Sequence, residues 1–289
     1  MNKNVIFSYA WKNFTERFFS KKTFILALIL FFSEHLFIIG VGEFCVAVQH
    51  KITPYIFPFL ISYIYFQLIY TMVVLYYFAD VPFMQYRGMY QVIRMGRVKW
   101  VLGHVGYIFL SSLGLSLLLV LESIVILFPQ IEWSGEWGKI LHTLALTDAG
   151  SQYDVYPIPF SEEVMRQYTP LQGMLLAIIV CTLVTAFLGM VMFVVSLWSS
   201  RVTAIGAASM FLCLPIFTKD VDDMFKYPIS CISPVSWLQI TEYGSEKYGI
   251  RQMPEVNYIM CGLVVLFVVL TVLIVWKIKK TEFRWSHEE

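Results

Sequence analysis

The sequence predicts an all-α integral membrane protein with six transmembrane helices and both termini in the cytoplasm. Three observations lead to this fold class. First, 58% of the 289 residues are apolar and 14% are charged, whereas about a quarter are charged in a typical soluble domain. Second, six apolar stretches approach the roughly 20 residues that a helix needs to cross a bilayer. Third, basic residues gather in alternate connecting segments, as they do in multi-pass proteins.

Residues 1–22 are predicted to form an amphipathic helix in the inner membrane interface. Four aromatic residues recur there at helical spacing, with charged residues between them: Phe7, Trp11, Phe14 and Phe18. Such a stripe is typical of a helix that lies at the level of the lipid headgroups. The alternative is a plain cytoplasmic extension of the first span.

Residues 23–289 are expected to form a single six-helix transmembrane domain. Its predicted spans are 23–41, 55–79, 101–128, 171–196, 202–217 and 256–276. The first is a span rather than a signal peptide, because no small-residue cleavage site follows it closely. The fifth is short and rich in small residues, which predicts close packing inside the bundle.

The distribution of Lys and Arg sets the orientation. With the N-terminus inside, the inner segments carry 14 of the 21 basic residues, so the positive-inside rule places both termini in the cytoplasm. The connecting segment 80–100 is then also cytoplasmic, and the long segments 129–170 and 218–255 lie outside. These features describe a multi-pass protein of the cell membrane, surrounded by lipid.

The two outer segments are too long for simple turns. In 129–170, residues 136–146 have a helix-like pattern, and Ser161 followed by two glutamates is typical of a helix start. The segment 218–255 contains a semi-apolar stretch interrupted by prolines, which could dip into the outer leaflet if protein covers it. Cys45 and Cys231 are the two cysteines that could meet outside, and two unpaired thiols are the favoured interpretation.

Polar residues inside the spans are candidates for a substrate path or an ion site. Glu34 and His35 lie roughly 17 Å along the first span, near the bilayer midplane. A carboxylate at that depth favours a proton or cation site, or a polar wall. An interhelical hydrogen bond is the equally weighted alternative. Glu122, near the outer interface, is a weaker candidate, and Gln67 stands in an aromatic face that is more often ordinary packing.

The segment 80–100 is basic and amphipathic. In helical spacing one face carries apolar and aromatic side chains, the flank carries arginines, and Gly96 ends the helix. The residues concerned are Tyr86, Met89, Tyr90 and Ile93 on the face, Arg87 and Arg94 on the flank, and Arg97 beyond the glycine. A helix of this kind suits docking into the groove of a partner. The alternative is a helix held by anionic lipid headgroups.

Motifs for catalysis are absent from the sequence. The chain has no phosphate-binding loop of the ATPase type, no zinc-protease helix motif and no serine-hydrolase elbow, and its five histidines are scattered. We therefore expect no catalytic residue, no cofactor site and no metal site in this chain. A net charge of +1 argues against nucleic acid as a partner.

As a whole, the pattern resembles the membrane subunit of a type-2 ATP-binding-cassette (ABC) exporter, and in particular the compact permeases of Gram-positive bacteria that export peptides or confer resistance to them. The resemblance is carried by the basic helix before the first span, the six spans, and the broken semi-apolar segment before span six. Its sharpest local element is the run 92–100, VIRMGRVKW.

The resemblance implies a complex of two permease chains, identical or homologous, with two cytoplasmic ATPase subunits that bind ATP and Mg²⁺. It makes 80–100 the coupling loop, whose contacts with the ATPase are Arg87, Met89, Tyr90, Ile93, Arg94 and Arg97. The first outer loop is longer than in minimal lipid or polysaccharide exporters of this superfamily, which favours a peptide or antimicrobial substrate.

Two other classes stay open. The first alternative is a proton- or cation-coupled secondary transporter that uses Glu34 and His35, although the chain has no internal repeat of the kind such folds often show. The second is a membrane enzyme or sensor subunit, which only the long outer segments favour.

Overall fold

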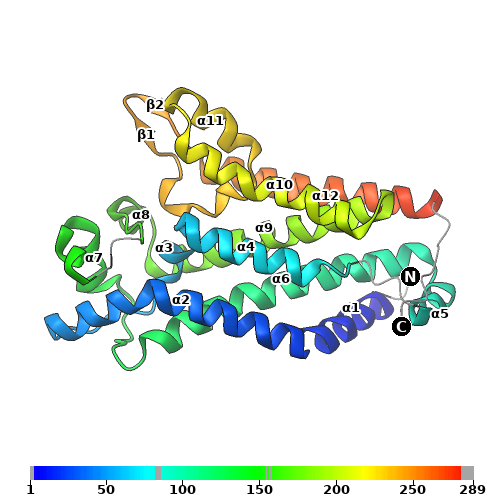
Figure 1. The fold of residues 1–289 in the computed structure, drawn as a ribbon, viewed down its shortest axis with the longest axis horizontal. Helices are drawn as coiled ribbons and strands as arrows, with labels where there is room; N and C mark the ends of the chain where they lie inside the picture. The colour runs from blue at the N-terminus through cyan, green and yellow to red at the C-terminus, as the bar shows by residue number, and fades with distance from the viewer. Residues whose placement is uncertain (1–2, 82–85, 154, 156–157, 281–289) are drawn as a thin grey trace.

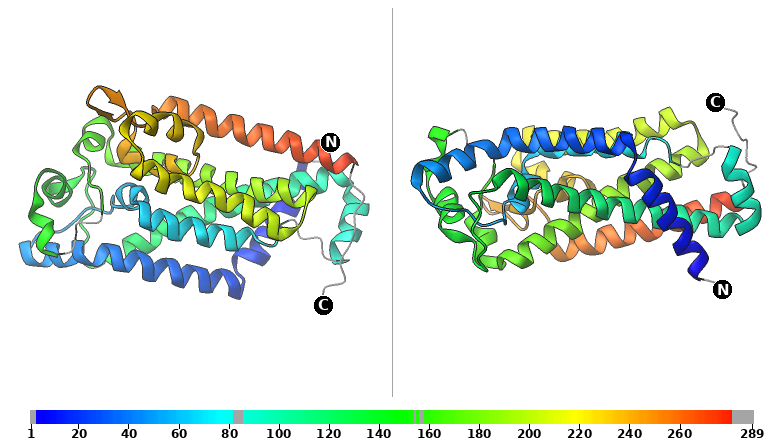
Figure 2. Two further views of the ribbon diagram at one scale, coloured as in Figure 1. Left: turned by 45° about the horizontal axis from the view of Figure 1, so that its top comes forward. Right: turned by 90° about the horizontal axis from the view of Figure 1, so that it is seen from below.

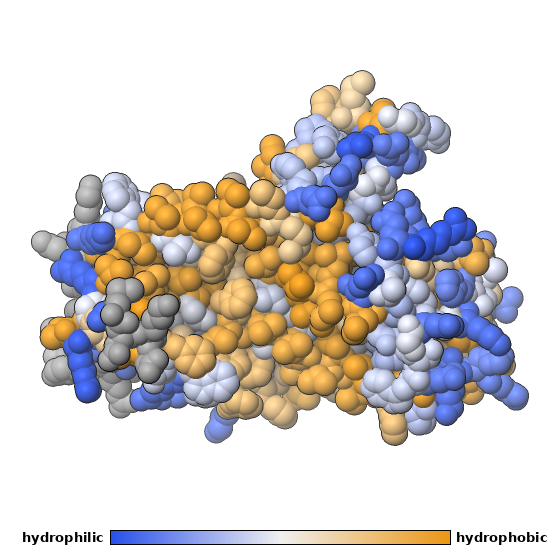
Figure 3. Space-filling model, turned by 180° about the vertical axis from the view of Figure 1, so that it is seen from behind, coloured by the Kyte–Doolittle hydropathy of each residue, from blue (hydrophilic) through white to orange (hydrophobic). Residues whose placement is uncertain are grey.

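The computed structural model describes residues 3–81, 86–153, 155 and 158–280. In this part of the chain the protein is all-α apart from one small hairpin, and five helices are long and apolar enough to cross a membrane. Figure 3 shows an apolar belt between two hydrophilic ends. The fold is therefore that of a multi-pass membrane protein.

The five long helices run along the length of the molecule. They are α2 (Lys21–Val48), α6 (Arg97–Leu127), α9 (Pro170–Trp198), α10 (Arg201–Asp220) and α12 (Val256–Lys280). Helix α9 is the central one, since it contacts α4, α6, α10 and α12 and most of its residues are buried.

Most of the shorter elements gather at the two ends of the bundle, whereas α4 lies within it. They are α1 (Lys3–Phe18), α3 (Phe57–Ser62), α4 (Ile64–Phe78), α5 (Tyr86–Met95), α7 (Gly138–Leu146), η1 (Asp148–Tyr153), α8 (Glu162–Gln167), α11 (Asp223–Ile232), η2 (Ser236–Leu238), η3 (Ile240–Glu242), β1 (Glu246–Lys247) and β2 (Ile250–Arg251). Helix α5 lies at the same end as the last turns of α12, and α7 and α8 lie at the other (Figures 1 and 2). We call these the inner end and the outer end, after the sides on which the positive-inside rule predicts them to lie.

The second predicted span is not one continuous helix. Residues 55–79 hold α3 and α4, which are separated at Tyr63 by an extended backbone conformation. The Ser62 hydroxyl donates to the Pro58 carbonyl at 2.7 Å, and all six residues of α3 are buried. At 15 residues, α4 is about 22 Å long, shorter than the hydrocarbon core that a full span crosses.

The fifth predicted span forms a helix, but the expectation that it lies inside the bundle is wrong for this chain. Ala204 and Ala208 are buried, whereas Val202 and Met210 are exposed. Small residues therefore bring one face of α10 close to α9, and the opposite face stays open.

Residues 1–22 contain a helix of their own. The chain turns after α1 because Ser20 caps α2, its hydroxyl accepting from the Thr23 amide. Helix α1 packs along α6, where Gly103, Gly106 and Gly114 leave room for its side chains. The aromatic stripe thus begins exposed at Phe7 and ends packed against the core at Phe18.

The outer end contains the local structure that was expected there. Helix α7 covers most of residues 136–146, and α8 begins after Ser161. The semi-apolar part of 218–255 forms α11 and two 3-10 turns, and Val235, Trp237 and Leu238 are buried by the rest of the protein. Cys45 and Cys231 are free, as expected.

Candidate functional site

The short helix α5 follows α4 and precedes α6 in the chain, and it lies at the inner end of the molecule (Figure 1). It ends where predicted, because Gly96 has a φ of +82°, a conformation that favours glycine. The side chains of Arg87, Met89 and Tyr90 lie outside the described part of the structure.

The described side chains of this segment divide between core and surface. Ile93 is 70% exposed although it is apolar, and Arg94 and Arg97 are also exposed. By contrast, Val92 and Trp100 are buried. The segment therefore has one anchored face and one open face that carries an isoleucine and arginines.

Helix α5 is connected to α6 through a single residue, so a displacement of α5 would be passed on to α6. The Gly96 amide donates to the Val92 carbonyl at 2.8 Å, and the Trp100 amide donates to the Gly96 carbonyl at 3.1 Å. Trp100 is fully buried. A single glycine therefore joins the two helices, and a buried tryptophan anchors the first turn of α6.

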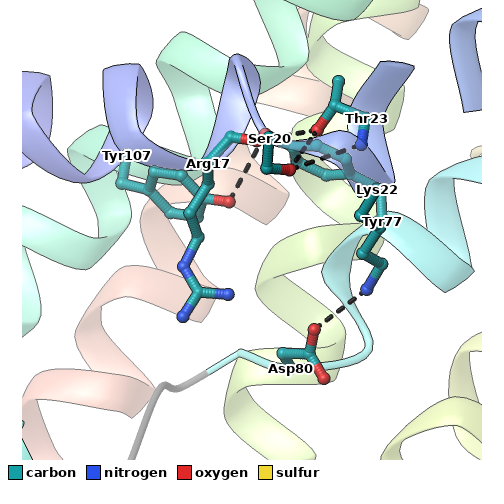
Figure 4. A network of polar contacts seen from close by, with 7 residues as sticks. All are labelled: Arg17, Ser20, Lys22, Thr23, Tyr77, Asp80 and Tyr107. Carbon is teal, nitrogen blue, oxygen red and sulfur yellow. Dashed lines mark hydrogen bonds and ion pairs between the residues drawn. The ribbon is translucent and has the colours of Figure 1, made fainter. Parts of the chain in front are cut away.

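A polar network lies beside this segment, around a cavity of about 380 Å³. Its lining residues come from α1, α2, α4 and α6 and the turns beside them: Arg17, Ser20, Lys22, Thr23, Tyr77, Asp80 and Tyr107. Lys22 Nζ is 2.9 Å from Asp80 Oδ2, and the Thr23 hydroxyl donates to the Arg17 carbonyl at 2.7 Å (Figure 4). The network ties α1 and α2 to the point where α4 leads towards α5.

The charges in this network are partly exposed, so each contributes little alone. The Lys22–Asp80 pair keeps 31% and 44% of its side chains exposed, and solvent screening leaves it worth about 0.5 kcal/mol. Burial lowers the pKa of the Arg17 guanidinium, and Tyr107 and Asp80 oppose that shift.

Sequence reasoning did not find this network. Asp80 was visible as the one acid of the segment 80–100, and Lys22 as part of a basic pair before the first span. Their pairing joins residues 58 positions apart, which no local pattern can reveal.

Two of the predicted polar residues come together inside the bundle. Glu34 on α2 is fully buried, and Glu122 on the neighbouring helix α6 is 9% exposed. Within the described part of the chain, both oxygens of Glu34 and Oε2 of Glu122 have no hydrogen-bond partner. A buried carboxyl pair with open oxygens is the kind of site that takes up a proton or a cation.

The other two predicted residues lie elsewhere. His35 is exposed and lines a groove of about 460 Å³ between α2 and the end of α6. It does not face the bundle interior as Glu34 does, because neighbouring residues on a helix point in different directions. Gln67 is buried and donates to the Val235 carbonyl, which ties α4 to the loop before η2. Among the described residues, no group of three or more His, Cys, Asp or Glu side chains could hold a metal.

Hydroxyl groups join α4, α6 and α9 at the centre of the bundle. Tyr70 Oη lies 2.6 Å from Thr185 Oγ1, and the Thr182 hydroxyl donates to Ser116 at 3.2 Å. Phe66, Tyr77 and Phe78 of α4 are buried, and Tyr70 adds a polar contact of the kind that membrane helices commonly use.

Comparison with the known protein families, with curated proteins and with solved structures finds no match for this chain.

Proposed function

We propose that this chain is the membrane subunit of an ATP-driven exporter of the type-2 ABC class. It would move a hydrophobic or amphipathic substrate, preferably a peptide or antimicrobial, outward across the cytoplasmic membrane of a bacterium. Five candidate spans support a transport role. The absence of a phosphate-binding loop in the sequence agrees with ATP hydrolysis on a separate ATPase subunit.

The observation that carries the proposal is the open face of α5. Ile93 is apolar yet 70% exposed on a ten-residue helix, at the hydrophilic inner end and beside two arginines. A groove on a cytoplasmic ATPase subunit would cover it, as amphipathic helices are covered elsewhere. The contact would consist of Ile93, Arg94 and Arg97 together with Arg87, Met89 and Tyr90.

The mechanism follows from the anchoring of that helix. Two ATPase subunits would bind ATP and Mg²⁺ and close on each other, and the contact would displace α5. The displacement would pass through Gly96 and Trp100 into α6, and through the Asp80–Lys22 network into α1 and α2. A second permease chain, identical or homologous, would form the other wall of the substrate path.

Transport in vesicles tests the proposal. The chain and its ATPase are reconstituted, and accumulation of a labelled amphipathic peptide is measured with ATP, without ATP, and with ionophores that collapse ion gradients. We expect accumulation to require ATP hydrolysis and to survive the ionophores. Transport that survives without ATP and stops with the ionophores would contradict the proposal.

The carboxyl pair favours a second candidate, a proton- or cation-coupled transporter. Glu34 and Glu122 supply a buried site with open oxygens, although His35 points away from it. For this candidate, Glu34→Gln abolishes transport. In an ATP-driven exporter the same variant keeps ATP-dependent transport, because the amide conserves the size of the side chain and introduces no charge.

A further inference from the structure

The groove of about 460 Å³ between α2 and the end of α6 opens to the surface of the bundle. Ile38 and Leu127 line it with buried side chains, whereas Val46 and Phe128 line it with exposed ones. It is therefore an apolar furrow between two membrane helices. The coupling segment lies at the other end of the molecule, and neither member of the carboxyl pair lines the groove.

The groove lies in the outer half of the bilayer. Helix α2 begins at Lys21 and runs along the length of the molecule (Figure 1). At 1.5 Å per residue, His35 is about 21 Å and Glu43 about 33 Å from that start. Because the hydrocarbon core is about 30 Å thick, Glu43 reaches the level of the outer headgroups, and His35 lies about 12 Å below it, among the lipid chains.

One face of α2 forms a wall of the groove. His35, Ile39, Gly42 and Val46 follow one another at i, i+4, i+7 and i+11, a spacing that places them on the same side of a helix. Gly42 leaves a gap in this row, since no atom of the described chain lies within 4 Å of the position that a Cβ would take. An apolar chain can therefore lie close against the backbone of α2.

Two polar side chains line the groove and are accessible from it. His35 and Glu43 are both exposed, and within the described part of the chain neither has a hydrogen bond or an ion pair. Lipid chains offer no partner, so ionisable residues in membrane helices usually face the interior or mark a substrate path. A phospholipid with its headgroup at the surface would leave the His35 imidazole without a partner. The chemistry of the groove therefore favours a ligand with a polar group inside its apolar part.

We propose that this outer groove binds a cationic amphiphile whose ammonium group lies at Glu43. An amide or hydroxyl group of the ligand, about 12 Å further along its apolar chain, forms a hydrogen bond with His35. The negative charge of Glu43 complements the ammonium, and the apolar walls of the groove cover the chain. As a release site for exported molecules this rests on the proposed function, whereas the binding itself requires no ATPase.

Photochemical labelling of the purified full-length chain in lipid nanodiscs tests the inference. The probe is a primary alkylamine with an amide about 12 Å from its nitrogen and a diazirine at the far end. One matched probe has a hydroxyl group in place of the amine, and another has two methylenes in place of the amide. At equal membrane-bound concentration, we expect saturable labelling of 35–47 and 126–130 by the first probe. The hydroxyl probe should bind about tenfold more weakly, because a charge-assisted hydrogen bond is lost.

Variants locate the site. Gly42→Leu fills the gap in α2 and should abolish saturable labelling, while Gly206→Leu is the matched control because Gly206 is likewise open, on α10. Glu43→Gln should weaken binding about tenfold, whereas Glu136→Gln in the outer segment should leave it unchanged. His35→Phe keeps an aromatic ring and should weaken binding about fivefold, as for one hydrogen bond. Thermal unfolding checks that each variant is folded, and if Gly42→Leu is not, Glu43→Gln decides.

Equal labelling by the amine and hydroxyl probes, or labelling that Gly42→Leu does not reduce, overturns the inference. A phospholipid that competes as strongly as the unlabelled probe overturns it too, because ordinary lipid then fills the groove. Labelling confined to other sites, as when a second copy of the chain covers the groove, has the same meaning. If the probe fails to label the groove while ATP-driven export operates, the site assignment fails and the proposed function stands. Specific labelling of a chain that never associates with an ATPase gives the opposite outcome.

Discussion

Replacing Ile93 with aspartate tests whether the open face of α5 docks a partner or only contributes to the fold of this chain. Ile93 is 70% exposed, so the chain itself buries less than a third of it, and the substitution should change stability by no more than about 0.5 kcal/mol. Export driven by ATP, in contrast, should be lost, because a negative charge replaces the apolar centre of the α5 contact.

The magnitude follows from the exposed fraction. Full burial of an isoleucine side chain is worth about 1.5 to 3 kcal/mol, so covering the exposed 70% contributes about 1 to 2 kcal/mol. That corresponds to about 5- to 30-fold in affinity for the partner. Burying the aspartate carboxylate in the same groove weakens the contact further.

The assay compares ATP hydrolysis and peptide export in vesicles that contain the chain and its ATPase. Ile232 offers a matched control, since it is 74% exposed on α11, a ten-residue helix at the opposite end. Ile93→Asp should lose export while Ile232→Asp retains it, with both proteins folded. Normal export and unchanged ATPase affinity for Ile93→Asp would refute the coupling role of α5.

Three further predictions concern stability, measured by thermal or denaturant unfolding in detergent. A Cβ at Gly189 would lie 2.8 Å from one core atom, whereas none lies within 4 Å at Gly206, so Gly189→Ala should cost about 1 to 3 kcal/mol, and Gly206→Ala should not destabilise the protein. A double-mutant cycle with Lys22→Met and Asp80→Asn should give a coupling energy of about 0.5 kcal/mol. Zero coupling would mean that the ion pair contributes nothing. The pKa of Asp223 is lowered by hydrogen bonds from Lys226 and Lys247, so its stabilising effect is present above its unfolded pKa and is lost as the pH falls through the folded value. Asp223→Asn should therefore melt below the wild type at pH 7, with a difference that disappears in acid. A constant difference would contradict this reasoning.

Local signals in the sequence predicted local structure well. Gly96 ends α5 because its backbone conformation suits glycine, and Ser161 with the following glutamates precedes α8. The apolar stretches predicted the bounds of the long helices to within a few residues, except that α2 continues to Val48. These features depend on neighbouring residues alone.

Features that depend on tertiary contacts were not predictable. No glycine or proline marks the break at Tyr63, which is stabilised instead by the buried surroundings of α3. Adjacent helix positions differ in direction, so the sequence could not tell that Glu34 faces inward and His35 outward. The Gln67–Val235 hydrogen bond joins residues 168 positions apart, which no local pattern predicts.

The most direct test of the central claim is purification of the full-length chain from its native membrane, followed by measurement of ATPase activity. Our account predicts that a cytoplasmic ABC-type ATPase co-purifies in equal amounts, hydrolyses ATP, and is lost from the Ile93→Asp variant. A chain that purifies without any ATPase, and whose transport is unaffected when ATP is depleted, would contradict the account.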